Sequence, residues 1–123
     1  MISLANYKDH NEIVEVWEQS VRATFNFPNE KYLQEIKSQL SSALRHVKVY
    51  VYRTKGESIK GFVGLKGHKV EMLFIRPEYF GHDVEMQLTN FCIYSLHIYE
   101  LNVKERDESA LEFYKNLHPI SNI

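Results

Sequence analysis

The chain has 123 residues, a formal net charge of −1 and a hydrophobic fraction of 44%, which is the composition of an ordinary soluble globular protein and not of a disordered or acidic segment. The length favours one domain over residues 1–123. The near-neutral charge argues against a nucleic acid partner, and no apolar run approaches the roughly 20 residues that span a bilayer, so we expect no membrane segment and a cytoplasmic location.

The first third of the chain predicts a short strand and two helices. Residues 2–4 read as the strand. Asp9 is placed as the N-cap of the first helix, which we expect to end near Thr24. Pro28 and Asn29 open the second helix. The apolar stripe of the first helix is Ile13, Val16, Trp17, Ser20 and Val21, and that of the second is Leu33, Ile36, Leu40 and Leu44.

The middle of the chain predicts three antiparallel strands. Residues 47–52 alternate between valines and polar or tyrosine side chains, which is the period of a half-buried strand. Lys55-Gly56 and Lys66-Gly67 read as turns, and they separate this segment from strands at residues 59–65 and 70–75. Together these three segments predict a meander of neighbouring strands.

Residues 70–92 predict a strand that crosses a short loop and enters a helix. The strand runs into Pro77, the loop contains Gly81, and apolar residues from Val84 to Ser95 recur at helical spacing. Residues 98–103 then predict a strand, and Asp107 caps a last helix. The order strand, helix, strand implies a parallel crossover between the strands at 70–75 and 98–103.

Three segments together carry a resemblance to a known family. They are the helix VEVWEQSVRATFNF, the strands around GFVGL and VEMLFIRPEYFG, and the terminal VKERDESALEFYKNL. The chain resembles the GNAT superfamily of acyl-coenzyme A-dependent N-acetyltransferases, and in particular its small bacterial members. The resemblance implies an α+β fold of three layers, with a mixed, mostly antiparallel central sheet and helices on both faces. It also implies acetyl-coenzyme A as cofactor and a small-molecule or peptide amine as acceptor.

The resemblance assigns the cofactor to the strand at 70–75, to the loop after it and to the last helix. The loop is ordinarily Arg/Gln-x-x-Gly-x-Gly/Ala, and here the basic residue and both key glycines are replaced. Asp83 and Glu85 bring negative charge to a diphosphate, so we expect weak affinity for acetyl-coenzyme A. The implied cofactor residues are Leu73, Phe74, Ile75, Phe80, Gly81, His82, Asp83, Val84, Glu85, Asp107 and Ala110.

The resemblance also implies catalytic and acceptor residues, each with a structural alternative. Tyr114 is the candidate general acid and otherwise a core aromatic. Glu71 is the candidate general base and otherwise a solvated carboxylate paired with Lys69 or His68. The acceptor side is assigned to Trp17, Arg22 and Phe25, of which Trp17 is more often simple core.

The remaining chemistry-bearing residues favour structural roles. Cys92 is the single cysteine and lies on an apolar helix face, where a buried thiol is favoured over a nucleophile. The six histidines form no zinc motif, so no metal site is expected. Two functions stay open, an active N-acetyltransferase and a degenerate acyltransferase fold that acts as a binding or regulatory module. A helical face that binds nucleic acid or a partner is disfavoured by the neutral charge.

The family pattern continues beyond the last helix with two further strands, and the sequence given stops before them, either because it is a truncated form or because the segment has been lost. The expected fold is therefore GNAT-like without its last two strands. The strand at 98–103 is then left at an open edge, and open edges are normally covered. We expect a homodimer in which two copies of this strand, or a swapped C-terminal segment, meet across a two-fold axis.

Overall fold

A computed structural model of the chain describes residues 1–54, 56–81, 83–98 and 100–101. The predictions for His82 and for residues 102–123, among them Asp107, Ala110 and Tyr114, lie outside the described residues. No helix within the described ranges is long and apolar enough to cross a membrane.

A five-stranded sheet forms the middle layer, in the order β1-β2-β3-β4-β5. The strands β1 to β4 are antiparallel, and β5 is parallel to β4. The expected meander and the expected parallel crossover are both confirmed. Gly67 has a φ of 61° in the hairpin between β3 and β4, a conformation that favours glycine. The strands are β1 (Ile2–Leu4), β2 (Lys48–Arg53), β3 (Ile59–Lys66), β4 (Lys69–Ile75) and β5 (Glu100–Leu101).

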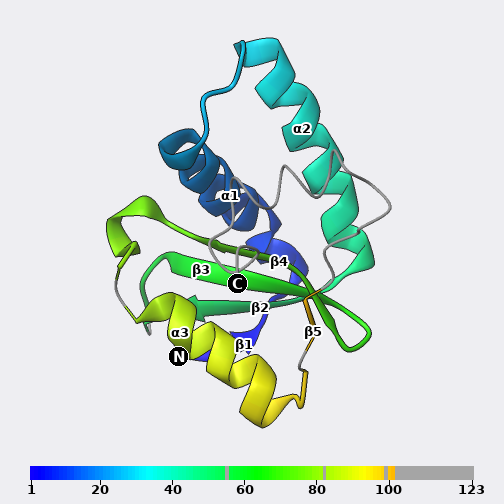
Figure 1. Ribbon diagram of the computed structural model, residues 1–123, viewed down its shortest axis with the longest axis vertical. Helices are drawn as coiled ribbons and strands as arrows, with labels where there is room; N and C mark the ends of the chain where they lie inside the picture. The colour runs from blue at the N-terminus through cyan, green and yellow to red at the C-terminus, as the bar shows by residue number, and fades with distance from the viewer. Residues whose placement is uncertain (55, 82, 99, 102–123) are drawn as a thin grey trace.

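Helices cover both faces of this sheet, which confirms the α+β layering (Figure 1). The helices α1 (His10–Thr24) and α2 (Glu30–Ala43) lie on one face, and α3 (Val84–Asn90) lies on the other. Asn29 begins α2 as expected, because its side chain accepts a hydrogen bond from Tyr32 N at 2.8 Å. Short helical turns complete the chain at Tyr7–Asp9, Leu44–His46 and Pro77–Tyr79, and a π-helical turn at Phe91–Ser95.

The sheet divides the interior into two apolar clusters. The cluster under α1 and α2 contains Trp17, Phe62 and Phe74, and the cluster under α3 contains Leu73 and Leu88. All five side chains are at most 2% exposed. Burial of one such side chain contributes about 1.5 to 3 kcal/mol, so these clusters hold the helices against the sheet.

Asp9 occupies the N-cap position of α1, as expected, but its side chain does not cap that helix. The Asp9 side chain makes no capping hydrogen bond to α1. It closes instead a reciprocal box with Asn6, in which Asp9 Oδ2 accepts from Asn6 N at 3.0 Å. An asparagine three residues earlier starts the helical path one turn sooner than the apolar stripe indicates.

The helix expected after the loop begins at Val84 as predicted but changes type along its length, and the strand expected from Ile98 starts later. α3 passes at Phe91 into the π-helical turn, and Ile98 N donates to Cys92 O at 2.8 Å. Ile98 is therefore held by the helix end, and the strand starts at Glu100 instead. His97 lies between them with a φ of 58°, which reverses the chain.

Candidate active site

The edge of β4 that faces β5 is the part of the sheet that the resemblance assigns to the cofactor. Within the described part of the chain, β5 pairs only with the first two residues of β4. Arg76 N donates to Lys60 O at 2.9 Å, and hydrogen-bonded pairs alternate along an antiparallel ladder. The main-chain groups of Phe74 therefore point toward β3, whereas those of Leu73 and Ile75 point to the β5 side.

A β-bulge places Glu71 at the beginning of this edge. The register passes from Gly64↔Met72 to Leu65↔Val70, so Glu71 is the additional residue of β4. Bulges bend a strand, re-aim side chains and occur often beside active sites. Glu71 is half-buried, which leaves part of its surface open to solvent. Its role as a base stays a prediction.

The loop that joins β4 to α3 is acidic. Gly81 has a φ of 80°, a conformation that favours glycine. Asp83 is exposed and accepts a hydrogen bond from Gln87 Nε2 at 2.7 Å. Glu85 is half-buried in the first turn of α3, and this burial raises the pKa of its carboxyl group. No lysine or arginine occurs in residues 80–85.

These residues fit the two halves of acetyl-coenzyme A unequally. The N–H and C=O groups of Leu73 and Ile75 suit the amide-containing pantetheine arm, which pairs with a sheet edge as an added strand does. The loop suits a diphosphate poorly, because Asp83 and Glu85 add negative charge and no loop cation offsets them. Of the other predicted loop residues, Phe80 is partly exposed and the side chain of Val84 is buried under α3.

Trp17 lies in the core and not on the surface of α1. Its side chain is 0% exposed in the cluster under α1 and α2, which is the structural alternative that its apolar spacing favoured. Its Nε1 is buried and has no hydrogen-bond partner within the part of the chain that the structure describes. Contact with an acceptor through this side chain would need the helix to move.

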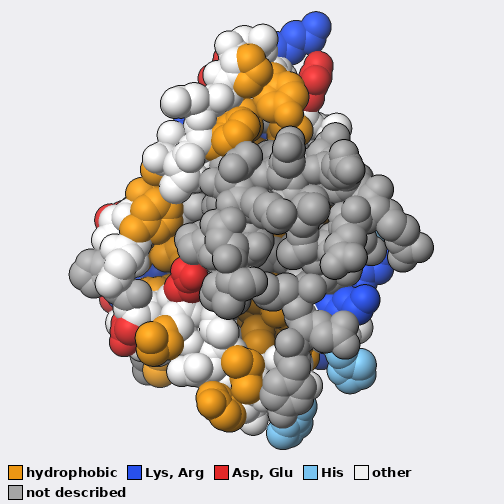
Figure 2. Space-filling view, in the orientation of Figure 1, with side chains coloured by type: hydrophobic (Ala, Val, Ile, Leu, Met, Phe, Trp, Pro, Cys, Tyr) orange, Lys and Arg blue, Asp and Glu red, His pale blue; other side chains and the backbone are white. Residues whose placement is uncertain are grey.

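Arg22 and Phe25 lie together where α1 leads into α2. Arg22 is exposed and forms ion pairs with Glu18 at 2.8 Å and Glu30 at 2.6 Å. Phe25 is half-buried, with its ring centroid 4.7 Å from that of Phe27. Hydrophobic side chains are visible at this end of the molecule and over α3 (Figure 2). An acceptor at this end meets carboxylates and aromatic rings together.

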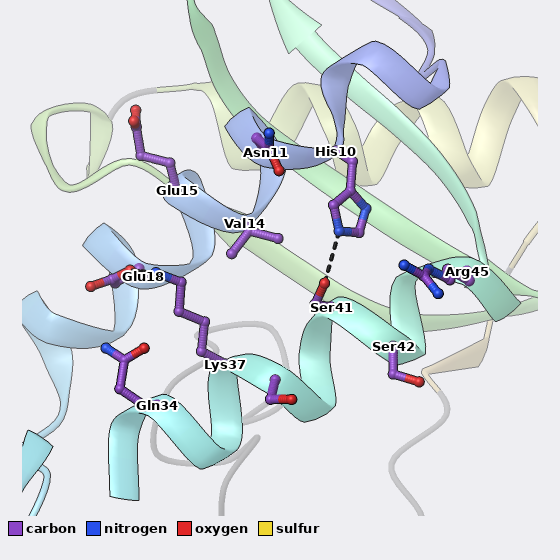
Figure 3. A pocket seen from close by; sticks show the side chains of 11 residues that line it. His10, Asn11, Val14, Glu15, Glu18, Gln34, Lys37, Ser41, Ser42 and Arg45 are labelled. Atoms are coloured by element: carbon purple, nitrogen blue, oxygen red, sulfur yellow. Dashed lines mark hydrogen bonds and ion pairs between the residues drawn. The ribbon is translucent and has the colours of Figure 1, made fainter. Parts of the chain in front are cut away.

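A polar pocket of about 880 Å³ lies between α1 and α2 (Figure 3). The His10 ring nitrogen Nε2 lies 2.9 Å from Ser41 Oγ, and Lys37 Nζ lies 2.7 Å from Glu18 Oε1. These two contacts bridge the helices. None of the predicted site residues lines this pocket. Its lining is His10, Asn11, Val14, Glu15, Glu18, Gln34, Lys37, Ser38, Ser41, Ser42 and Arg45.

Cys92 is a core thiol. It is 2% exposed in the cluster under α3, and burial raises its pKa to about 11. The thiolate is the reactive form of cysteine, so this environment keeps Cys92 inert near neutral pH. Among the residues that the structure describes, no three His, Cys, Asp or Glu side chains gather into a group that could hold a metal ion.

Arg76 is the site-adjacent residue that sequence patterns did not indicate. It directly follows β4 and is 7% exposed, which is rare for a charged side chain without partners. Its partners on α1 are Glu12, Glu15 and Gln19. The available signal was their spacing, because residues three, four and seven apart share one helix face. Three hydrogen-bond acceptors on the side of α1 next to the sheet indicate that a donor from the sheet lies close to them.

Comparison with known proteins agrees with this geometry. No family model matches the sequence. The chain is 28% identical over 116 residues to the peptidyl-lysine N-acetyltransferase YjaB of Escherichia coli K12, covering 94% of this chain and 79% of the relative. Its identity to YjaB of Salmonella typhimurium is 26% over 116 residues, covering 94% and 80%.

Solved structures show the same fold. The solution structure of the apo form of YjaB from Escherichia coli has a TM-score of 0.71 at 29% identity, covering 95% of this chain and 80% of that one. A GNAT family acetyltransferase from Brucella melitensis in complex with acetyl-CoA has a TM-score of 0.58 at 17% identity, covering 79% and 68%. The similarity to YjaB and the shared fold support a GNAT-superfamily acetyltransferase.

Proposed function

We propose that this chain transfers the acetyl group of acetyl-coenzyme A to an amine, and that the amine is a lysine side chain in a peptide. The observation that carries the proposal is the edge of β4, where Leu73 and Ile75 turn their main-chain groups toward β5 beyond the last described pairing of the two strands. The peptide acceptor is supported by the similarity to two peptidyl-lysine N-acetyltransferases over 94% of the chain.

In this proposal the main chain of β4 binds the cofactor and two side chains move protons. Leu73 and Ile75 hydrogen-bond the pantetheine arm. When bound, acetyl-coenzyme A supplies a thioester whose carbonyl carbon an amine can attack. Glu71, at the bulge, takes a proton from the acceptor ammonium directly or through water. Tyr114 gives a proton to the departing sulfur, a role that rests on the resemblance alone.

The acceptor side in this proposal is the end of the molecule where α1 leads into α2. Arg22 and Phe25 lie there, and Glu18 and Glu30 accompany Arg22. The side chain of Trp17 supports this region from the core.

The second candidate function is a degenerate acyltransferase fold that acts as a binding or regulatory module. The observation that favours it is the acidic loop, where Asp83 and Glu85 face no cation from residues 80–85. Both candidates predict the same fold. They differ in whether acetyl-coenzyme A binds and is consumed.

Calorimetric titration of acetyl-coenzyme A into the purified chain separates these functions when it is followed by a turnover assay. We expect binding, release of free thiol in the presence of a lysine peptide, and a mass increase of one acetyl group on that peptide. The matched control is the same peptide with its lysine already acetylated. Binding without thiol release across a panel of lysine peptides supports the module, and absence of binding refutes the enzyme.

The assembly and cellular location are further parts of the proposal. We propose that residues 1–123 form one domain, that the protein works in the cytoplasm, and that it is a homodimer through β5. The support for the dimer is the position of β5 at the end of the strand order. Leu101→Pro removes a backbone donor from this strand, so we expect the variant to sediment as monomer or aggregate. A native chain that sediments as a monomer at high micromolar concentration refutes the dimer.

A further inference from the structure

We propose that Arg76 is a positioning residue, which fixes the end of β4 against α1 and thereby sets the starting point of the cofactor loop. The inference rests on the proposed function for its link to acetyl-coenzyme A. Its structural half, the attachment of the loop, stands on contacts that do not involve a ligand.

The first observation is that all three nitrogen atoms of the Arg76 guanidinium contact an acceptor. Nε donates to Ile59 O at 2.6 Å, and Nη1 donates to Gln19 Oε1 at 2.9 Å. Nη1 also lies 2.8 Å from Glu15 Oε1, and Nη2 lies 3.5 Å from Glu12 Oε2. The planar fork of arginine reaches these partners from one fixed geometry, which a lysine cannot do. One buried side chain therefore joins three residues of α1, spread over about two helical turns, to the sheet.

The second observation is a register shift in the sheet, at which the Arg76 network supplies hydrogen bonds to the main chain. The pairing of β2 with β3 shifts register between Tyr52 and Arg53, and the shift places Ile59 opposite Arg53. At this shift, both main-chain groups of Ile59 form hydrogen bonds with side chains. Ile59 N donates to Glu12 Oε2 at 2.6 Å, and Ile59 O accepts from Arg76 Nε at 2.6 Å. Buried backbone groups need such partners, so the network is a structural requirement of the bulge.

The third observation is where Arg76 lies along the chain. Ile75 is the last residue of β4, and Pro77 begins the turn that leads to Gly81 and Asp83. Arg76 N donates to Lys60 O, and Arg76 O accepts from Tyr79 N, each at 2.9 Å. Arg76 is thus held on its side chain by α1 and on its backbone by both β3 and the turn. A loop that starts from a fixed residue has fewer conformations to lose when it binds a ligand.

α1 also carries Arg22 and is followed directly by Phe25, both on the proposed acceptor side. The same helix that Arg76 holds at Glu12, Glu15 and Gln19 therefore ends at the acceptor entrance. The geometry joins the cofactor loop and the acceptor helix through one guanidinium. A change at Arg76 is expected to alter both surfaces without touching either ligand.

The test compares Arg76→Lys with Arg53→Lys. Arg53 is the matched control, because it also forms a partly buried ion pair next to α1, with Asp9 at 2.7 Å, and its other described partners, Met1 and Ile59, lie outside the loop. Amide hydrogen exchange is measured by NMR in the full chain. We expect Arg76→Lys to lower the protection of Tyr79 and Phe80 amides at least tenfold while amides of β2 keep theirs. Arg53→Lys is expected to leave the loop amides unchanged.

Calorimetry then links the loop to the cofactor. We expect Arg76→Lys to weaken acetyl-coenzyme A binding at least tenfold and Arg53→Lys to change it less than twofold. Glu12→Gln, which keeps an acceptor for Ile59 N, is expected to lie between them. Loop protection equal to the native chain in Arg76→Lys overturns the positioning role. A uniform loss of protection across the sheet overturns it as well, since that is the result of general destabilisation.

The two arms separate this inference from the proposed function. If the native chain binds no acetyl-coenzyme A, the proposed function fails, and the exchange of Tyr79 and Phe80 still decides whether Arg76 holds the loop. If the native chain binds and Arg76→Lys binds equally well with a loosened loop, the proposed function stands and the link from Arg76 to the cofactor is refuted.

Discussion

Removing the negative charge of the loop after β4 is expected to strengthen the binding of acetyl-coenzyme A. The variant is Asp83→Asn with Glu85→Gln. Asparagine keeps an acceptor for Gln87 Nε2, which lies 2.7 Å from Asp83 Oδ2. Glutamine keeps the size of the half-buried Glu85 side chain. The change therefore removes charge and little else, which a pair of glycines would not do.

The magnitude follows from the exposure of the two carboxylates. Asp83 is exposed, so its repulsion of a phosphate charge about 6 Å away is close to the value in water, about 0.7 kcal/mol or roughly threefold in affinity. Glu85 is half-buried, where an effective dielectric near 20 gives about 2.8 kcal/mol, or roughly a hundredfold, as the upper value. We expect the double variant to bind at least tenfold more tightly.

Calorimetry at two salt concentrations tests the electrostatic origin of this gain. The gain should shrink as salt rises, because screening reduces the repulsion in the native chain. Glu35→Gln is the control, since Glu35 is an exposed carboxylate on α2, on the other face of the sheet. Native affinity in the low micromolar range, or equal affinity before and after the double change, refutes the reasoning.

Burial of Glu85 adds a pH dependence. Because burial raises the pKa of Glu85, this carboxyl group takes up a proton at a higher pH than an ordinary glutamate. The folded state then binds more protons than the unfolded state between the two pKa values, and stability falls as pH rises through that window. Glu85→Gln should remove this slope from thermal unfolding between mildly acidic and neutral pH. A slope that persists in the variant assigns the pH dependence to another group.

Separate tests address Tyr114, Cys92 and Asp9. Tyr114→Phe should lower turnover by roughly 10²- to 10⁴-fold with little change in cofactor affinity, and an unchanged rate assigns Tyr114 to packing. Cys92, with a pKa of about 11, should react with iodoacetamide at pH 8 at least a hundredfold more slowly in the folded than in the unfolded chain. Burial raises the pKa of Asp9, but hydrogen bonds from Asn6 N and Arg53 outweigh it, so the net shift is downward. Asp9→Asn should therefore cost about 1 to 3 kcal/mol at neutral pH and remove a stability term that the native chain loses as pH falls through the lowered pKa, which acid unfolding measures.

The sheet was predictable because its information is local. Alternation in residues 47–52 and the glycine turns define strands whose partners are neighbours in sequence. The N-cap at Asn29 was predictable for the same reason, because its partner Tyr32 is three residues away. The position of Asp9 before α1 was predicted, but the hydrogen bond of its side chain was not, because Asn6 caps the preceding turn and takes the Asp9 carboxylate into its capping box. Nothing in the apolar spacing indicates this arrangement.

The Arg76 network could not be predicted from the sequence because its information is not local. Arg76 lies 57 residues from Gln19 along the chain and 17 from Ile59. A sequence window around Arg76 shows an arginine before a proline, which is consistent with an exposed loop. Its burial depends on α1 lying across the ends of β3 and β4, which is a property of the packed fold.

The bulge at Glu71 changes which side chains of β4 share a face, a detail that the predicted strand at residues 70–75 did not contain. In a regular strand Val70, Met72 and Phe74 would share one face. Here Val70 packs with the cluster under α3, whereas Met72 and Phe74 belong to the cluster under α1 and α2. The additional residue changes the phase between Val70 and Met72, so that Leu73 and not Met72 continues the face of Val70. Glu71 thus lies at the one point of β4 where the alternation of faces is interrupted. The strand therefore contributes side chains to both apolar clusters and still places a carboxylate at the bulge.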